Sequence, residues 1–179
     1  MQKIEALYEK TLPTYGLFKF YSDRRDNEGS DLYNIFDGEE WVGFIYLISS
    51  TRMENITLIA IDASGRPKGY GSAVLDLVKE LHKGKPIVLL MDTVDPKCED
   101  FEVKQKRKAF YERNGFITRY YGGTTKQPME MAIYGDDYNL KDYTELNGKL
   151  IGGLGGRLFA WMQTKSFTND IKISVKSNL

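Results

Sequence analysis

The chain has 179 residues, with 25 lysines and arginines balanced by 25 aspartates and glutamates. This length can fill one hydrophobic core, so we expect a single compact unit. Because the formal net charge is zero, nothing in the composition points to nucleic acid or to an anionic membrane as a partner.

Cysteine and histidine are almost absent. Cys98 has no second cysteine with which to form a disulfide, and Cys98 and His82 together are too few for an ordinary zinc site. The N-terminal MQKIEALYEK lacks the apolar centre of a signal peptide, and no segment approaches the ~20 apolar residues of a membrane span. We therefore expect a cytoplasmic protein with no metal.

The first segments of the chain have the patterns of a helix and a β-hairpin. Ile4, Leu7 and Tyr8 recur at helical spacing and are followed by Pro13, which predicts a short helix. Two runs rich in aromatic and β-branched residues follow, joined by DGEE. They predict antiparallel strands over Asp31–Phe36 and Trp41–Ile48.

A strand–helix–strand crossover comes next. Asn55–Asp62 shows little alternation, which is typical of a strand buried on both faces, so helices should pack on either side of it. A helix should follow and end before Gly84 and Pro86, with a second buried strand over Ile87–Met91. The apolar residues that we expect on one face of that helix are Ala73, Val74, Leu77, Val78 and Leu81.

The rest of the chain predicts one more helix and a strand pair. Gly115 should stop a helix over Lys104–Asn114, and the strands are expected at Phe116–Tyr121 and Met129–Tyr134. The predicted order is α-β-β-β-α-β-α-β-β. From Leu140 the pattern weakens, although Tyr143–Ile151 could be helical. We interpret residues 1–139 as one domain and 140–179 as an extension, either packed on the domain or in a homodimer contact.

A glycine-rich segment lies between the buried strand and the helix that follows it. A Walker loop is excluded because Tyr70 follows Gly69 where a lysine is required. A dinucleotide fingerprint starting at Gly69 would need glycine or alanine where Val74 stands. What remains is Arg66-x-x-Gly69-x-Gly71, which resembles the acyl-CoA loop of the GNAT family of N-acetyltransferases. The alternative is a glycine-rich turn without a ligand.

Backbone chemistry supports an anion at this loop. N–H groups from Lys68 to Ser72 can point at a pyrophosphate, the helix dipole favours negative charge there, and Gly69 and Gly71 remove Cβ atoms that would block approach. Positive charge comes from Arg66 and Lys68. The expected loop residues are Arg66, Lys68, Gly69, Tyr70, Gly71 and Ser72.

A second segment, AFYERNGF at Ala109–Phe116, is similar to the later helix of the same family and its exit. The two motifs stand in the family's order, and the resemblance covers roughly Ile4 to Tyr134. It implies an α/β (α+β) fold of the GNAT acyl-CoA acyltransferase type, with a mixed central sheet flanked by helices on both faces.

The resemblance also implies a reaction. In this family an amine attacks the thioester of acetyl-CoA directly, within a ternary complex. Tyr111 occupies the position of the general acid that protonates the departing thiolate, although it could instead only pack with Phe110 and Phe116. Backbone groups of Ile59 and Ile61 would hold the pantetheine arm, and a main-chain N–H near Ile61 would stabilise the oxyanion.

The sequence departs from the family pattern at two positions. Thr57 stands where many members carry a glutamate base, which leaves Asp92, Glu54, Asp62 or a chain of waters as alternatives. Lys104 stands where many relatives have an asparagine that contacts the cofactor. Its neighbours Arg107 and Lys108 could reach a phosphate instead, or these side chains could form a solvated helix face.

The acceptor amine cannot be named from the sequence. In this fold its site would be bordered by Thr11–Ser30 and Tyr120–Met129, whose aromatic residues could hold an amine by cation–π contact or equally belong to the core. They are Tyr15, Phe18, Phe20, Tyr21, Tyr120 and Tyr121.

Two other functions remain open. Thr57 favours a non-catalytic acyl-CoA-binding or regulatory module on the same fold. The second alternative is a protein interaction module, in which the segment GGLGGRLFAWMQ docks to a partner.

Overall fold

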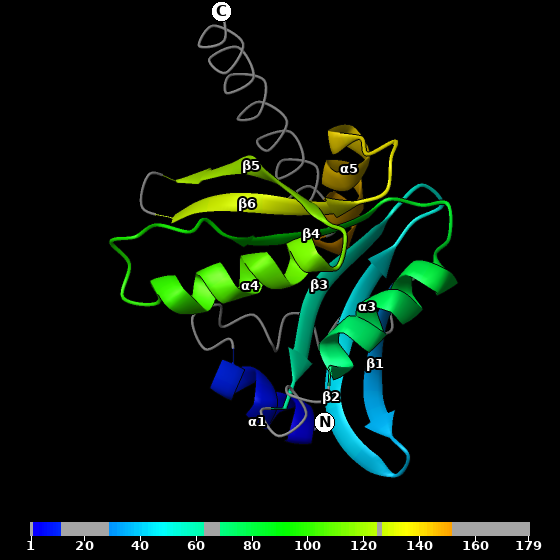
Figure 1. The fold of residues 1–179 in the computed structure, drawn as a ribbon. Helices are drawn as coiled ribbons and strands as arrows, with labels where there is room; N and C mark the ends of the chain where they lie inside the picture. Colours follow the sequence, from blue (N-terminus) through cyan, green and yellow to red (C-terminus); the bar gives the residue numbers. More distant parts are fainter. Residues whose placement is uncertain (1, 12–28, 63–68, 125–126, 152–179) are drawn as a thin grey trace, which may run out of the picture. The chain divides into compact units, whose positions relative to one another are not determined.

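The computed structural model describes residues 2–11, 29–62, 69–124 and 127–151 (Figure 1). The chain divides into two compact units, Met1–Lys83 and Gly84–Leu179. The elements follow the predicted order, with one helix added at the end. They are α1 (Gln2–Thr11), β1 (Ser30–Asp37), β2 (Glu40–Ser49), β3 (Glu54–Ile61), α3 (Tyr70–Leu81), β4 (Ile87–Asp92), α4 (Phe101–Arg113), β5 (Ile117–Thr124), β6 (Gln127–Tyr134) and α5 (Leu140–Ile151).

The strands of the first unit form an antiparallel β1–β2–β3 meander. The predicted DGEE connection is a two-residue turn, across which Asp37 pairs with Glu40 and in which Gly38 has a φ of 60°. This left-handed conformation is the reason for a glycine at that position. On the other side of β2, Phe44 pairs with Ala60 of β3.

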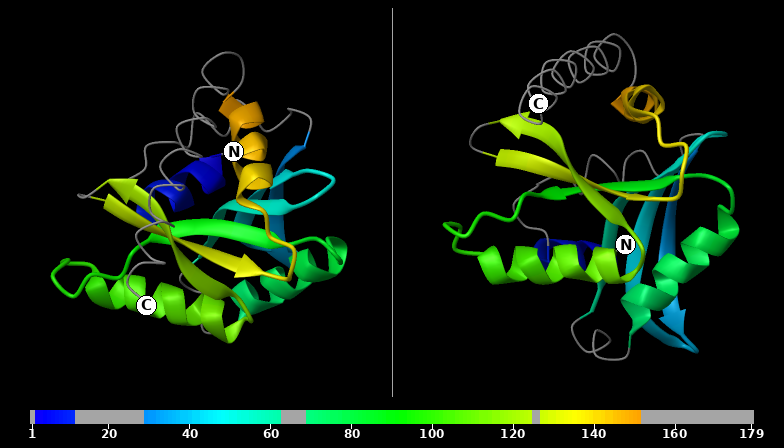
Figure 2. Two further views of the ribbon diagram at one scale, coloured as in Figure 1. Left: turned by 90° about the horizontal axis from the view of Figure 1, so that it is seen from above. Right: turned by 45° about the horizontal axis from the view of Figure 1, so that its top comes forward.

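Helices cover both faces of this meander, as predicted for a strand buried on both sides. The apolar face of α1 (Ile4, Leu7 and Tyr8) is buried against Phe44 and Ala60. Helix α3 packs against β3, and the two views in Figures 1 and 2 place α1 and α3 on opposite faces. Burial of these side chains away from water is the main force that holds each helix on the sheet.

The prediction of which α3 residues face the sheet is partly wrong. The helix buries Val74, Leu75 and Val78, whereas Leu77 and Leu81 are 57% and 68% exposed. The sequence contains two overlapping apolar stripes on this helix, and a small rotation about its axis decides which of them faces the sheet. Local periodicity alone therefore could not choose between them.

In the second unit, β6 lies between β4 and β5 and is antiparallel to both, with Leu90 of β4 opposite Met131 and Thr118 of β5 opposite Ala132. Helix α4 begins three residues earlier than predicted, at Phe101. It ends where expected, because Gly115 has a φ of 83°, a left-handed conformation that terminates helices.

The last described element is helix α5, which starts three residues before the predicted segment. Tyr143, Thr144 and Leu146 of this helix are buried. The ring of Tyr143 packs edge-on against Tyr121 of β5, with 5.6 Å between the ring centres. The domain boundary at residue 139 and the homodimer contact stay predictions. No helix in the described part of the chain is both long and apolar enough to cross a membrane.

Candidate functional site

The glycine segment forms the N-terminal end of α3. Gly69 is the N-cap residue, with φ 80° and ψ 10°, a left-handed conformation that a side chain would strain. The backbone N–H groups of Ser72 and Ala73 donate to its carbonyl oxygen at 3.1 and 3.2 Å. Tyr70, Gly71 and Ser72 make up the first turn, while Arg66 and Lys68 lie outside the described residues.

This helix end has the properties of an anion site. The first N–H groups of any helix point along its axis without intrahelical acceptors, and the dipole places partial positive charge there. The first turn of α3 carries no acidic residue that would repel an anion. The geometry therefore suits a phosphate group, as the loop pattern predicted.

Strand β3 leads to this helix and carries the two isoleucines of the predicted pantetheine contact. Ile59 pairs with Ile45 and Ile61 pairs with Gly43 of β2. A Cβ atom on Gly43 would lie 2.3 Å from the carbonyl oxygen of Ala60, so the glycine permits β2 and β3 to approach closely. On the same strand Thr57 accepts a hydrogen bond from the Asn55 side chain at 3.4 Å.

Tyr111 lies on α4 in the second unit and is 6% exposed. Its ring packs edge-on against Phe110 and Phe116, with centres 5.1 and 5.8 Å away. Burial raises the pKa of the phenol to about 12, against the smaller opposing effect of the Arg107 charge. The aromatic packing that we considered as the alternative role is present, and the phenol is also held in the protonated form that a general acid needs.

Lys104 and Lys108 of α4 are held in ion pairs and are not on a fully solvated helix face. The Lys108 ammonium lies 2.8 Å from the Glu130 carboxylate of β6, and Lys104 lies 3.1 Å from Asp100, with lysine side chains only 30% and 15% exposed. Burial acts to lower the pKa of Lys104, but the Asp100 hydrogen bond and the charges of Asp92 and Asp100 outweigh it and raise the pKa. Lys104 is thus already paired within the protein.

Asp92 ends β4, where it pairs with Met129 of β6. The next residue, Thr93, donates its backbone N–H to Pro128 at 3.1 Å. Its hydroxyl oxygen is buried and has no hydrogen-bond partner among the described residues. Sequence reasoning missed Thr93, since a threonine after a strand has no distinctive pattern. A buried polar atom beside a carboxylate suits contact with a polar ligand.

No protein-family model matches the sequence, and no curated protein matches it. Solved structures do. A protein described as a GNAT-family acetyltransferase, from Bacteroides thetaiotaomicron, is 25% identical, with a TM-score of 0.65 over 87% of this chain and 91% of that one. The chain has the GNAT fold.

Two further GNAT-fold neighbours were solved with coenzyme A. An aminoglycoside 6'-N-acetyltransferase is 15% identical, with a TM-score of 0.56 over 74% of this chain and 88% of that one. A Bacillus subtilis acetyltransferase is 16% identical, with a TM-score of 0.52 over 75% and 91%. These similarities confirm the predicted fold class.

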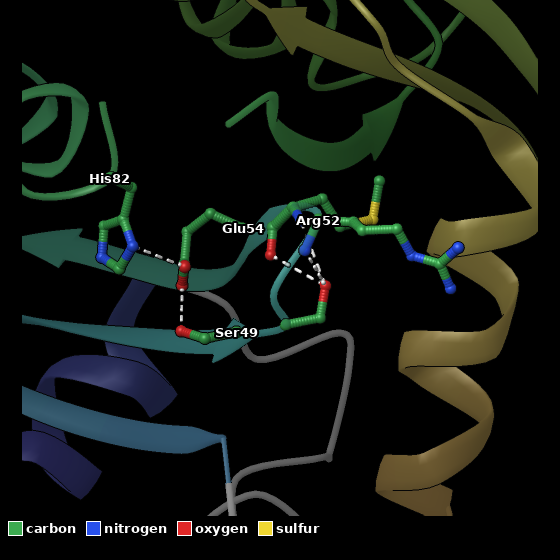
Figure 3. Close-up of polar contacts among 6 residues, drawn as sticks. Ser49, Arg52, Glu54 and His82 are labelled. Carbon is green, nitrogen blue, oxygen red and sulfur yellow. Dashed lines mark hydrogen bonds and ion pairs between the residues drawn. The ribbon is translucent and has the colours of Figure 1, made fainter. Parts of the chain in front are cut away.

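Glu54, one of the alternatives considered for the catalytic base, is held in contacts with Ser49 and His82 (Figure 3). Its side chain is completely buried at the start of β3. One oxygen accepts a hydrogen bond from the Ser49 hydroxyl at 2.7 Å, and the other lies 2.9 Å from Nδ1 of His82, the C-cap residue of α3. These partners join β2, β3 and α3, which indicates a structural role for the carboxylate.

His82 has a structural partner that the sequence analysis did not identify. The only histidine of the chain is the partner of a buried carboxylate. The pairing joins residues 28 positions apart in sequence, so no local pattern could have indicated it. No group of three or more potential metal ligands lies among the residues that the structure describes.

The predicted site residues therefore form two groups. Ile59, Ile61 and Gly69–Ser72 lie on β3 and at the start of α3 in the first unit. Asp92 ends β4 and Tyr111 lies on α4 in the second. Of the aromatic residues proposed to border the acceptor, Tyr121 is buried, and burial raises the pKa of its phenol.

Proposed function

We propose that this protein is an acetyl-CoA-dependent N-acetyltransferase that transfers the acetyl group to an amine by direct attack in a ternary complex. The observation that supports this function most is the similarity to GNAT acetyltransferases, two of them solved with coenzyme A. The left-handed Gly69, where an added Cβ atom would meet no described atom within 4 Å, gives a local reason for acyl-CoA binding at the N-terminus of α3.

In the proposed complex the glycine loop binds the pyrophosphate and β3 binds the pantetheine arm. Arg66 and Lys68 would add positive charge, and the backbone N–H groups of Gly69, Tyr70 and Gly71 would donate hydrogen bonds, since that of Ser72 already donates to Gly69. Backbone groups of Ile59 and Ile61 would pair with the amides of pantetheine as a neighbouring strand does.

The reaction requires two proton movements. The amine nitrogen attacks the thioester carbon, and the Ile61 N–H stabilises the negative oxygen of the tetrahedral intermediate. The Asp92 carboxylate accepts the proton lost by nitrogen. As the carbon–sulfur bond breaks, Tyr111 donates its phenolic proton to the thiolate, and an amide and free coenzyme A are formed. The high pKa of Tyr111 keeps this proton available at neutral pH.

A second candidate is a non-catalytic acyl-CoA-binding module on the same fold. Thr57 favours it, because this side chain cannot ionise and only accepts a hydrogen bond from Asn55. Such a module would bind acetyl-CoA without transferring its acetyl group to an amine.

A thermal melt with acetyl-CoA, coenzyme A and NAD tests the proposed ligand. A ligand at ~100 times its Kd adds ~2.7 kcal/mol to the free energy of unfolding, which for this chain length raises Tm by roughly 5–10 °C. We expect this shift with acetyl-CoA and coenzyme A but not with NAD. An unchanged Tm with all three would reject the acyl-CoA site. Product formation with a panel of amines then separates the enzyme from the binding module.

A further inference from the structure

A hydrogen bond that the Arg66-x-x-Gly69-x-Gly71 pattern does not include links the glycine loop to the sheet. The phenol of Tyr70, the first residue of α3, donates a hydrogen bond to the carboxylate of Asp37, the last residue of β1. The two residues are 33 positions apart, so the contact exists only in the folded chain. Both belong to the first unit.

Asp37 is held on a well-defined support. It pairs with Glu40 across the two-residue turn of the β1–β2 hairpin, and such short turns leave the backbone little freedom. Close to the turn, the Trp41 indole donates a hydrogen bond to the Asn34 side chain at 2.8 Å and joins the two strands a second time. The Asp37 carboxylate therefore lies at an end of the hairpin that the turn and this hydrogen bond both hold in place.

The loop side of the contact has less support from packing. Gly69 has no side chain, is exposed, and a Cβ atom built on it would meet no described atom within 4 Å. Nothing in the described structure thus packs against that position. The hydrogen bond from the neighbouring Tyr70 adds a link between the first turn of α3 and the β1–β2 hairpin.

We propose that Asp37 is a positioning residue for the acyl-CoA loop, acting through its hydrogen bond with Tyr70. This inference rests on the proposed function of the loop. The bond holds the first turn of α3 in the orientation that binds a pyrophosphate. The loop therefore loses less conformational entropy when the ligand binds. Such preorganisation increases affinity without adding any contact to the ligand.

The negative charge of Asp37 gives a way to test this role. Charge alone would oppose an anionic ligand nearby, so removing it should tighten binding. Asp37→Asn removes the charge but keeps an oxygen that accepts the phenolic hydrogen bond, whereas Asp37→Ala removes both. Positioning therefore predicts opposite effects for these two variants, and a pure charge effect predicts the same effect for both.

The experiment measures Kd for acetyl-CoA and coenzyme A by titration calorimetry, using the full chain. The variants are Tyr70→Phe, Asp37→Ala, Asp37→Asn and the double variant Tyr70→Phe/Asp37→Ala. Asp76→Asn is the matched control, since Asp76 is an exposed aspartate on the same helix that pairs only locally, with Lys79 at 2.8 Å. A melt of each variant without ligand reports any general loss of stability.

We expect Tyr70→Phe and Asp37→Ala each to weaken binding by about 2- to 10-fold, the effect of one lost surface hydrogen bond. The double variant should bind no more weakly than either single variant, and Asp37→Asn and Asp76→Asn should bind at least as tightly as the wild type. Unchanged Kd values, or equal tightening by Asp37→Ala and Asp37→Asn, would overturn the inference while the wild type still binds. A wild type that binds no acetyl-CoA would overturn the proposed function, and the role of Asp37 with it.

Discussion

At the scale of single residues, Tyr111 is both a core residue and the candidate general acid. It is buried among aromatic rings, and burial raises the pKa of its phenol and so holds it protonated. Replacement by phenylalanine would keep the rings in place and remove only the oxygen. The acid role can therefore be tested without disturbing the core.

We expect Tyr111→Phe to lower the rate of the proposed acetyl transfer by about 100-fold or more, with Kd for acetyl-CoA unchanged, because general acid catalysis contributes effects of this size. An unaltered rate would remove Tyr111 from the acid role. The pKa of about 12 adds a pH criterion, since deprotonation of Tyr111 should not reduce the wild-type rate below about pH 10.

The same raised pKa affects stability at high pH. The unfolded chain releases this proton near its ordinary pKa of about 10, whereas the folded chain retains it up to about 12. The contribution of Tyr111 to stability is thus fully present below pH 10 and lost as pH rises toward 12. Unfolding of Tyr111→Phe should show less of this alkaline loss than the wild type.

Glu54 is the other residue whose surroundings decide its role. A completely buried carboxylate is tolerated only when it is paired and hydrogen-bonded, and Ser49 and His82 supply those contacts (Figure 3). Removing the charge would leave His82 without its anionic partner and would weaken the link between α3 and the sheet.

We expect Glu54→Gln to lower the free energy of unfolding by about 3 kcal/mol, as for other buried pairs that lose one partner. Glu80→Gln is the control, because Glu80 is exposed and pairs only with Lys83 on the surface; it should change stability by less than about 0.5 kcal/mol. Urea denaturation at neutral pH measures both. If both variants changed the free energy of unfolding equally, the buried contacts of Glu54 would contribute no more to stability than a surface ion pair.

At the scale of elements, α3 shows what amphipathic patterns leave undecided. Leu75 is completely buried, while Leu77, two residues later, lies on the exposed side of the helix. Both are leucines in the same helix, so they form a matched pair that differs mainly in burial.

Leu75→Ala should therefore destabilise the protein by about 2–5 kcal/mol, since it removes buried methyl groups and leaves a cavity. Leu77→Ala should change stability by less than about 0.5 kcal/mol. Chemical denaturation of the two variants compares them directly. Similar losses would mean that Leu77 is covered in solution.

Helix α4 shows the opposite problem, because its inner face is charged rather than apolar. Lys104, Arg107, Lys108 and Tyr111 recur at spacings of three and four residues, which places them on one side of the helix. Periodicity predicts such a side to face solvent. The structure instead partly buries Lys104 and Lys108 in ion pairs with Asp100 and Glu130, and the sequence contains no local sign of the second pairing.

At the scale of the whole molecule, α5 is the part that the family resemblance did not cover. Tyr143 and Leu146 are buried, and side chains of this kind contribute about 1.5–3 kcal/mol each when removed from water. A chain that ends at Asn139 should consequently have a lower Tm than one that ends at Ile151. Calorimetry of the two chains isolates the contribution of α5, and equal Tm values would contradict its role in the core.

Much of the architecture could be predicted because it depends on local chemistry. The DGEE turn between β-branched runs specified the hairpin, Gly115 ended α4, and the apolar runs marked β3 and β4. The glycine at the start of α3 was also identified locally, since the left-handed conformation of Gly69 favours a residue without a Cβ atom.

The sequence by itself thus determined the order of elements, the family resemblance and the glycine pattern of the loop. Only the tertiary structure decided which stripe of α3 is buried, that Glu54 pairs with His82, and that Tyr70 bonds to Asp37. These features depend on contacts between residues far apart in the chain. Propensity, spacing and turn chemistry act over a few residues, so they cannot specify a partner that folding brings in from elsewhere.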